Sequence, residues 1–170
     1  MPSHELGSWA VAIALTAVLG WASISDIRAR RIPNWTVLVT IGLFVPWALL
    51  HWGPWAAWAL VAGGIALVVG VALYAMGVTG AGDAKLFAAV ALFAGLGHLA
   101  ALALATALVG GLIAVVSLAS RPRRALMIFT FRGKGDFGRG IPYGVAIAIA
   151  ALLVVWQGLL NLPIPISGFT

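Results

Sequence analysis

The chain contains long stretches without a charged side chain. Residues 32–82 and residues 86–120 contain no Asp, Glu, Lys or Arg. Each stretch exceeds the roughly 20 apolar residues that a helix needs to cross a bilayer. Charged residues make up 8% of the chain and hydrophobic ones 63%, too few polar groups to cover a surface in water. We therefore expect one all-α integral membrane domain over residues 1–170.

Helix breakers divide these stretches into shorter elements. The sequence "HWGP" at 51–54 predicts a turn, with Trp47, Trp52, Trp55 and Trp58 as an interfacial belt around it. Pro142 is suited to the first position of a last helix. The expected helices span 6–25, 35–51, 55–77, 84–95, 98–119 and 141–160.

The basic residues decide whether residues 86–120 cross the membrane once or twice. All ten Lys and Arg lie in loop 26–34, at Lys85, or in segment 121–139. A break at "GLGH" (95–98) and two crossings place all of them on one side, as the positive-inside rule requires. This predicts six transmembrane helices, with both termini on the outer (periplasmic) side. The short helix 84–95 is expected to be partly sunk in the protein.

The same rule accounts for the net charge of +6 without a nucleic-acid partner. No run of basic residues is interleaved with aromatic residues as in a nucleic-acid-binding face. The expected surroundings are membrane lipids.

The four acidic residues are Glu5, Asp26, Asp83 and Asp136. Asp26 ends the first expected helix and Asp83 begins the fourth, so the topology places them at the same depth at the cytoplasmic membrane edge. Two carboxyl groups at one depth form a candidate pair. Alternatively, Asp26 is a solvated residue balanced by nearby arginines and Asp83 is an ordinary helix N-cap. Asp136 is interpreted as a loop charge.

The glycines favour the pair. The sequence "GAGD" (80–83) forms helix poorly, and irregular backbone at membrane depth is tolerated where it is buried in protein or lines a wet cavity. Gly80 and Gly82 lack Cβ atoms, so another chain can approach closely. One ionised carboxylate and one protonated carboxyl group are suited to peptide-bond hydrolysis.

Other catalytic groups are scarce. The chain has no cysteine. The three histidines (His4, His51 and His98) are interpreted as interfacial or loop residues on the outer side. We therefore expect neither a metal site nor a cofactor.

The helix ends also suggest a division of labour. Asp26 is expected at a helix C-terminus, where unpaired carbonyls disfavour negative charge, and Asp83 at a helix N-terminus, where free N–H groups favour it. This makes Asp83 the base and Asp26 the acid.

Three stretches in order resemble the type IV prepilin peptidases, the GxGD class of membrane aspartic proteases. They are Asp26 with the following "RARRIPN" (28–34), "GAGDAKL" (80–86) and "GIPYG" (140–144). The resemblance covers essentially the whole chain and matches the expected placement of these stretches between helices.

The resemblance implies roles for individual residues. Asp26 and Asp83 are the implied catalytic pair, and Gly80 and Gly82 form the flexible approach to the second aspartate. Further motif positions are Lys85 after the second aspartate, Arg31, Pro33 and Asn34 in the loop after the first, and Pro142 and Tyr143 at the start of the last helix, with a structural role.

The chain lacks the cysteine-bearing zinc segment of the larger members of that family. It resembles the short form associated with tight-adherence (Flp) pili, which implies proteolysis without methyl transfer. The expected protein is an intramembrane aspartic endopeptidase of the bacterial inner (cytoplasmic) membrane. Its implied substrates are prepilins or pseudopilins, from which it removes the basic leader at the cytoplasmic edge.

A small transporter or channel that relays protons through Asp26 and Asp83 is the alternative. Both acids lie at one membrane edge and the inner helix stretches are uncharged, which favours the protease. A third alternative is an inactive assembly factor that keeps the fold. The sequence does not specify which prepilin is cut or the oligomeric state.

Overall fold

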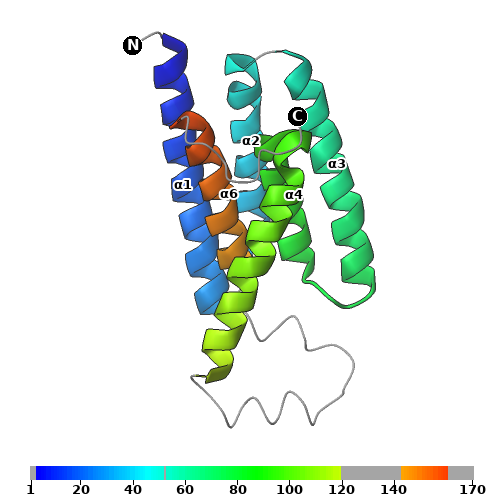
Figure 1. The fold of residues 1–170 in the computed structure, drawn as a ribbon. Helices are drawn as coiled ribbons and strands as arrows, with labels where there is room; N and C mark the ends of the chain where they lie inside the picture. Colours follow the sequence, from blue (N-terminus) through cyan, green and yellow to red (C-terminus); the bar gives the residue numbers. More distant parts are fainter. Residues whose placement is uncertain (1–2, 52, 120–142, 161–170) are drawn as a thin grey trace.

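The computed structural model describes residues 3–51, 53–119 and 143–160. Within these ranges the chain forms helices and no strand, so the all-α expectation is confirmed. The helices are α1 (Ser3–Ala29), α2 (Asn34–Leu50), α3 (Pro54–Ala75), α4 (Ala81–Ala119) and α6 (Tyr143–Leu159), shown in Figure 1.

Helix α4 reverses direction at Gly95. This residue has φ 65° and ψ 178°, a backbone conformation that is essentially restricted to glycine. A straight helix of its 39 residues would be about 58 Å long, nearly twice the hydrocarbon thickness of a bilayer. Figure 1 shows the chain rising through the first half of α4 and descending through the second. The break lies at the first residue of the predicted "GLGH" turn.

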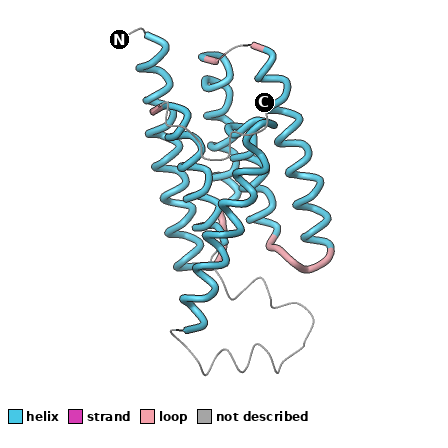
Figure 2. Tube along the Cα trace, in the orientation of Figure 1, coloured by secondary structure: helices cyan, strands magenta, loops and turns pink. Residues whose placement is uncertain are grey.

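The chain turns at two ends of the bundle. Residues 30–33 and 76–80 lie at the lower end in Figures 1 and 2, with the end of α4 and the start of α6. We call this the aspartate end, because Asp26 and Asp83 lie near it. The start of α3, the reversal of α4, the start of α1 and the end of α6 lie toward the opposite end. Segment 121–139, with its six basic residues, lies outside the described residues.

Three of the described helices are long and apolar enough to cross a membrane: Glu5–Ala29, Trp55–Ala75 and Ala81–Ser117. Helices α2 and α6 are shorter and also apolar. Six crossings and the orientation of the termini stay predictions.

Helix α4 is the centre of the packing. It contacts α3, α6 and α2, while α1 packs against α6 and α2. The first half of α4 is buried, as expected for a short helix sunk in the protein. Its buried residues are Ala84, Leu86, Ala88, Ala89, Val90, Ala91, Phe93 and Ala94.

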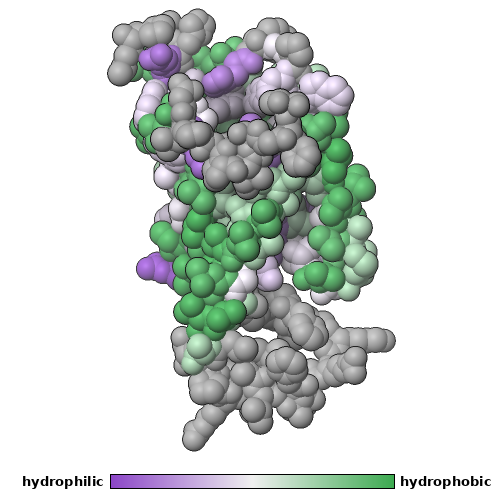
Figure 3. Space-filling view, in the orientation of Figure 1, coloured by the Kyte–Doolittle hydropathy of each residue, from purple (hydrophilic) through white to green (hydrophobic). Residues whose placement is uncertain are grey.

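Large apolar side chains also cover the outside of the bundle. Leu38, Val68 and Leu108 are 67%, 70% and 65% exposed. Figure 3 shows hydrophobic residues over the outer face of α3 and the second half of α4. Such a surface is suited to lipid hydrocarbon rather than water.

Two predicted helix boundaries near the aspartates were wrong. Helix α1 continues to Ala29, because the left-handed backbone of Arg30 (φ 52°), rather than the charge of Asp26, ends it. Helix α4 begins at Ala81, because the carbonyl of Gly80 already accepts the N–H of Ala84 at 3.0 Å. Gly82 and Asp83 are therefore helical, and the irregular backbone is confined to 76–80.

The predicted tryptophan belt is also partly wrong. Trp47 is 7% exposed and packs with its ring centroid 5.8 Å from that of Phe93. Trp58 is 56% exposed, as a belt residue would be, and Trp52 lies outside the described residues. Trp47 is buried because the reversal of α4 brings Phe93 against α2, a contact that hydropathy along the chain does not show.

Candidate active site

Asp26 is a buried acid held by the start of a distant helix. It lies in the last turn of α1 and is 7% exposed. The backbone N–H of Gly144, in the first turn of α6, donates a hydrogen bond to its Oδ2 at 2.8 Å. The first N–H groups of a helix have no partner within the helix, so α6 supplies a preformed donor for a carboxylate.

Asp83 lies opposite, in the first turn of α4. It is half-buried, and the backbone of Gly80 forms a hydrogen bond with its carboxyl group. The carboxyl groups of Asp83 and Asp26 are close enough to interact electrostatically. The structure thus brings together the two acids that the sequence singled out. Between two interacting carboxyl groups, the negative charge of one disfavours ionisation of the other.

Glycines line the space around the pair. A Cβ atom on Gly80 would lie 3.0 Å from Oδ2 of Asp83, and one on Gly144 would lie 2.9 Å from Oδ2 of Asp26. A Cβ atom on Gly82 would lie 3.2 Å from Cβ of Ile32. These distances are shorter than ordinary van der Waals contacts. The close approach expected at Gly80 and Gly82 is therefore made by parts of the chain itself.

Ile32 lies between the two helix starts that hold the carboxyl groups. Its Cδ1 lies 3.0 Å from the position of a Cβ atom on Gly144, while its Cβ lies against Gly82. Its side chain therefore fills the space between the first turns of α4 and α6, which hold Asp83 and the Asp26 carboxyl group. Ile32 acts as a spacer between the two helix ends.

Sequence reasoning missed both Ile32 and Gly144. The stretch "GIPYG" contains Gly144, but the hydrogen bond joins residues 118 positions apart and has no local signal. A glycine in the first turn of an apolar helix was the only available hint. Ile32 was one of many apolar residues, and nothing in the sequence distinguished it from the others.

The arrangement removes the basis for the predicted division of labour. That prediction considered the C-terminus of α1 at Asp26 but not the N-terminus of α6, whose Gly144 donates to the carboxylate. Both carboxyl groups lie at helix N-termini, so helix direction does not separate acid from base.

The loop after Asp26 connects α1 to α2. Arg31 is exposed, and its carbonyl accepts a hydrogen bond from Oγ of Ser25 at 2.9 Å. The carbonyl of Pro33 accepts the backbone N–H and the hydroxyl of Thr36, at 3.1 Å and 2.7 Å. Asn34 is the first residue of α2. These contacts fix the loop that carries Ile32.

The remaining motif residues surround the pair without joining it. Lys85 is exposed and lies beside Asn34 along a groove described below. Tyr143 opens α6 and packs against Gly110, where a Cβ atom would lie 3.0 Å from its Cε1. Pro142 and Asp136 lie outside the described residues.

The histidines lie away from the aspartates. His51 is at the opposite end of the bundle, with Nδ1 2.9 Å from the carbonyl oxygen of Trp47. His98 is exposed, three residues after the reversal at Gly95, and His4 lies in the first turn of α1. In the part of the chain that the structure describes, no three His, Cys, Asp or Glu residues gather as a metal site would need.

Comparison with known families gives one match. The model of the type IV leader peptidase family matches residues 13–115, a range that includes Asp26, Ile32, Gly80, Gly82 and Asp83. The chain matches no curated protein and no solved structure.

Proposed function

The chain belongs to the type IV leader peptidase family, and we propose that it is an aspartic endopeptidase using Asp26 and Asp83. Its substrates would be type IV (Flp-type) prepilins or pseudopilins, cut between the basic leader and the apolar helix. The observation that carries this proposal is the packing around Ile32. This side chain lies against Gly82, the neighbour of Asp83, and against Gly144, whose N–H binds the Asp26 carboxyl group.

The proposed reaction needs one proton on the pair. The ionised carboxylate accepts a proton from water while the water oxygen attacks the carbonyl carbon of the peptide bond. The protonated carboxyl group donates its proton to the carbonyl oxygen, so a neutral tetrahedral intermediate forms. The C–N bond then breaks as the nitrogen takes a proton from the pair, and one hydroxyl group of the intermediate gives its proton back to the pair as the carbonyl is restored. The pair returns to its singly protonated state.

The surrounding residues support this chemistry by position. The N–H of Gly144 fixes the Asp26 carboxyl group, and Ile32 fixes the spacing between the helix ends. Preorganised groups need little rearrangement during reaction, which is a large part of catalytic power.

We place the site at the cytoplasmic face of the bacterial inner membrane, with six crossings and both termini outside. Four described basic residues, Arg28, Arg30, Arg31 and Lys85, lie toward the aspartate end. Cytoplasmic ends of membrane helices are enriched in such residues. A basic leader would lie on this side, since it would resist transfer across the bilayer.

Purified protein in lipid vesicles tests the proposal. The substrate is a synthetic peptide with a basic leader followed by an apolar helix of about 20 residues. We expect one cut at the junction, identified by mass spectrometry, in the presence of EDTA and without methylation of the product. Asp83→Asn should abolish the cut, whereas Asp136→Asn should retain it. Cleavage by Asp83→Asn at the wild-type rate, or an EDTA-sensitive activity restored by zinc, would contradict the proposal.

A further inference from the structure

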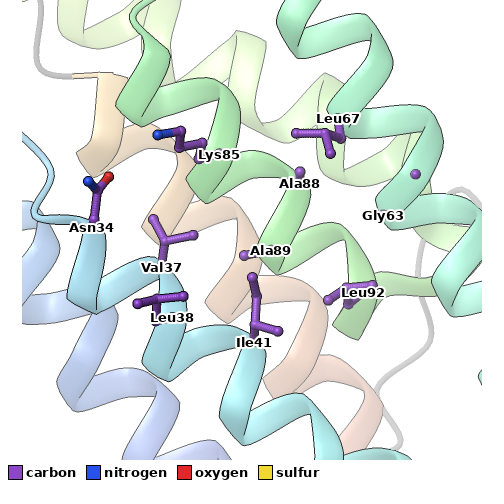
Figure 4. Close-up of a pocket in the computed structure, with 11 residues that line it drawn as sticks. Asn34, Val37, Leu38, Ile41, Gly63, Leu67, Lys85, Ala88, Ala89 and Leu92 are labelled. Atoms are coloured by element: carbon purple, nitrogen blue, oxygen red, sulfur yellow. The ribbon is translucent and has the colours of Figure 1, made fainter.

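A groove runs along the side of the bundle between α2 and α3. Helix α4 forms its floor, and its volume is about 580 Å³ (Figure 4). Each helix contributes residues from one face, at the spacing that aligns side chains along a helix. The lining residues are Asn34, Val37, Leu38 and Ile41 from α2, Gly63, Gly64 and Leu67 from α3, and Lys85, Ala88, Ala89 and Leu92 from α4.

The groove exists because α2 and α3 pack against α4 rather than extensively against each other, among the helices that the structure describes. Its lining is apolar apart from Asn34 and Lys85, which lie at one end of it in Figure 4. That end is level with Asp83 along the axis of α4, because Lys85 follows Asp83 by two residues, a rise of about 3 Å.

We propose that this groove binds the first two turns of the substrate's apolar helix. The inference rests on the proposed function, which requires a membrane-embedded helix to be held with its cytoplasmic end near Asp26 and Asp83. On α4 the groove extends from Lys85 to Leu92, which corresponds to about 10 Å, or two helical turns. It therefore fits the beginning of a helix rather than a full membrane span.

The shape of the lining favours a helix over a lipid chain. Gly64, Ala88 and Ala89 present almost no side chain to the groove, and small residues let the backbones of two helices approach closely. A Cβ atom on Gly64 would meet no neighbouring atom within 4 Å, so this glycine is not needed for packing within the bundle.

The polar end of the groove suits the stretch of substrate that precedes its helix. A protease needs an extended peptide bond, and extended backbone near membrane depth needs hydrogen-bond partners. Asn34 and Lys85 carry N–H donors, and neither side chain has a hydrogen-bond or ion-pair partner within residues 3–51, 53–119 and 143–160. They are therefore free to bind substrate carbonyl groups.

The substrate must pass around the start of α4 to reach the aspartates. Lys85 and Asp83 are about 200° apart around the helix, so the groove and the catalytic pair lie on opposite faces of α4. The path follows half the circumference of a helix about 10 Å wide, or about 16 Å, which about five extended residues span. The cut bond should therefore lie about five residues before the first turn held in the groove.

Crosslinking tests where the helix binds. The chain has no cysteine, so Leu67→Cys in the groove and Leu108→Cys on the outer face of α4 each provide one site for a photoreactive maleimide. Both are placed in the inactive Asp83→Asn protein with the leader–helix peptide described above. We expect peptide adducts from position 67 in about tenfold excess over position 108. Equal labelling, or adducts of position 67 with lipid or a second copy instead of peptide, would overturn the proposal.

Kinetics provide a second test in the active enzyme. Gly64→Leu fills the groove, and Gly111→Leu is the matched control, because a Cβ atom there also meets nothing within 4 Å. We expect Gly64→Leu to raise KM about tenfold with kcat unchanged. This is the effect of losing a contact that binds the substrate and the transition state equally well. Gly111→Leu should match the wild type. Unchanged KM in Gly64→Leu would overturn the groove while leaving proteolysis intact.

A truncated peptide separates the two proposals. It keeps the leader and the cut site but lacks the apolar helix. Wild-type cleavage of the full peptide with a KM about tenfold lower than for the truncated one supports the groove. Equal KM values would overturn the groove alone. Failure to cleave either peptide would contradict the proposed function, and the groove proposal with it.

Discussion

At the scale of single residues, the packing around Asp26 and Asp83 depends on glycines, because they have no Cβ atom. Gly80 and Gly144 each bring backbone against a carboxyl oxygen, and Gly82 makes room for Ile32. The sequence indicated Gly80, Gly82 and Asp83 through the "GAGD" stretch, and Asp26 through its place at the end of the first helix. It did not indicate Gly144 or Ile32, because their roles depend on contacts between helices that are far apart in the chain.

Gly144→Ala tests the support of Asp26. The new methyl group would lie 2.9 Å from Oδ2 of Asp26 and 3.0 Å from Cδ1 of Ile32, so it must displace the carboxyl group. We expect kcat to fall by about 10²-fold, since small misplacements of catalytic groups have effects of this size. KM should not change, because the groove is untouched.

Gly158→Ala is the control for this substitution. It lies on the same helix, and a Cβ atom there meets nothing within 4 Å. Its kcat should equal that of the wild type. A Gly144→Ala enzyme with wild-type kcat would show that the hydrogen bond to Asp26 is not needed for catalysis.

Ile32→Ala tests the spacer. Removing most of this side chain leaves a void between Gly82 and Gly144, so the first turns of α4 and α6 lose their common support. We expect a loss of kcat of about 10-fold or more, with a smaller loss in Ile32→Val, because a lost methylene is less damaging than a lost side chain. Equal kcat in all three proteins would contradict a spacing role.

At the scale of elements, the reversal of α4 organises the bundle. The sequence predicted the break at 95–98 from glycine and from the basic residues, and the structure has it at Gly95. The predicted bounds of α2 and α3 were accurate to about two residues, because "HWGP" separates them locally. The end of α1 and the start of α4 near the aspartates differ from the prediction, because Arg30 ends α1 and the Gly80 carbonyl begins the hydrogen bonding of α4 despite the nearby charges and glycines.

Gly95→Ala tests the reversal. Its backbone conformation costs other residues about 1–3 kcal/mol, and a Cβ atom would lie 2.7 Å from Nε1 of Trp55. We expect a lower midpoint of denaturant- or heat-induced unfolding in detergent. Gly97→Ala, where a Cβ atom meets nothing within 4 Å, should leave the midpoint unchanged or raise it. A wild-type midpoint in Gly95→Ala would mean that the break does not depend on glycine.

At the scale of the whole molecule, the apolar exterior and the position of the turns agree with a membrane bundle. Composition was sufficient to predict an all-α membrane protein, because a surface with so few charged residues is stable in lipid but not in water. The contacts between helices could not be predicted from the sequence. That arrangement depends on small residues meeting specific neighbours, as Gly70 meets Ala84, where a Cβ atom would lie 3.0 Å from the alanine Cβ.

Single cysteines test the proposed orientation in the cysteine-free chain. Position 53 caps the start of α3 and position 97 follows the break of α4 by two residues. Cysteines there should react with a membrane-impermeant maleimide added from outside. Cysteine at 165 should also react from outside, and cysteine at 134 should react only after permeabilisation. External labelling at 134 would reverse the orientation and move the proposed site to the other side of the membrane.

The central claim is that Asp26 and Asp83 act as one catalytic unit. Single-turnover cleavage of the leader–helix peptide by Asp26→Asn, Asp83→Asn and the double variant tests it most directly. Groups that act together are strongly non-additive, so each single substitution should slow cleavage by at least about 10³-fold and the double variant should be no slower than the singles. All three proteins should keep the wild-type unfolding midpoint to within a few degrees. A single variant with near-wild-type cleavage, or a double variant slower by the product of the two single effects, would contradict the claim.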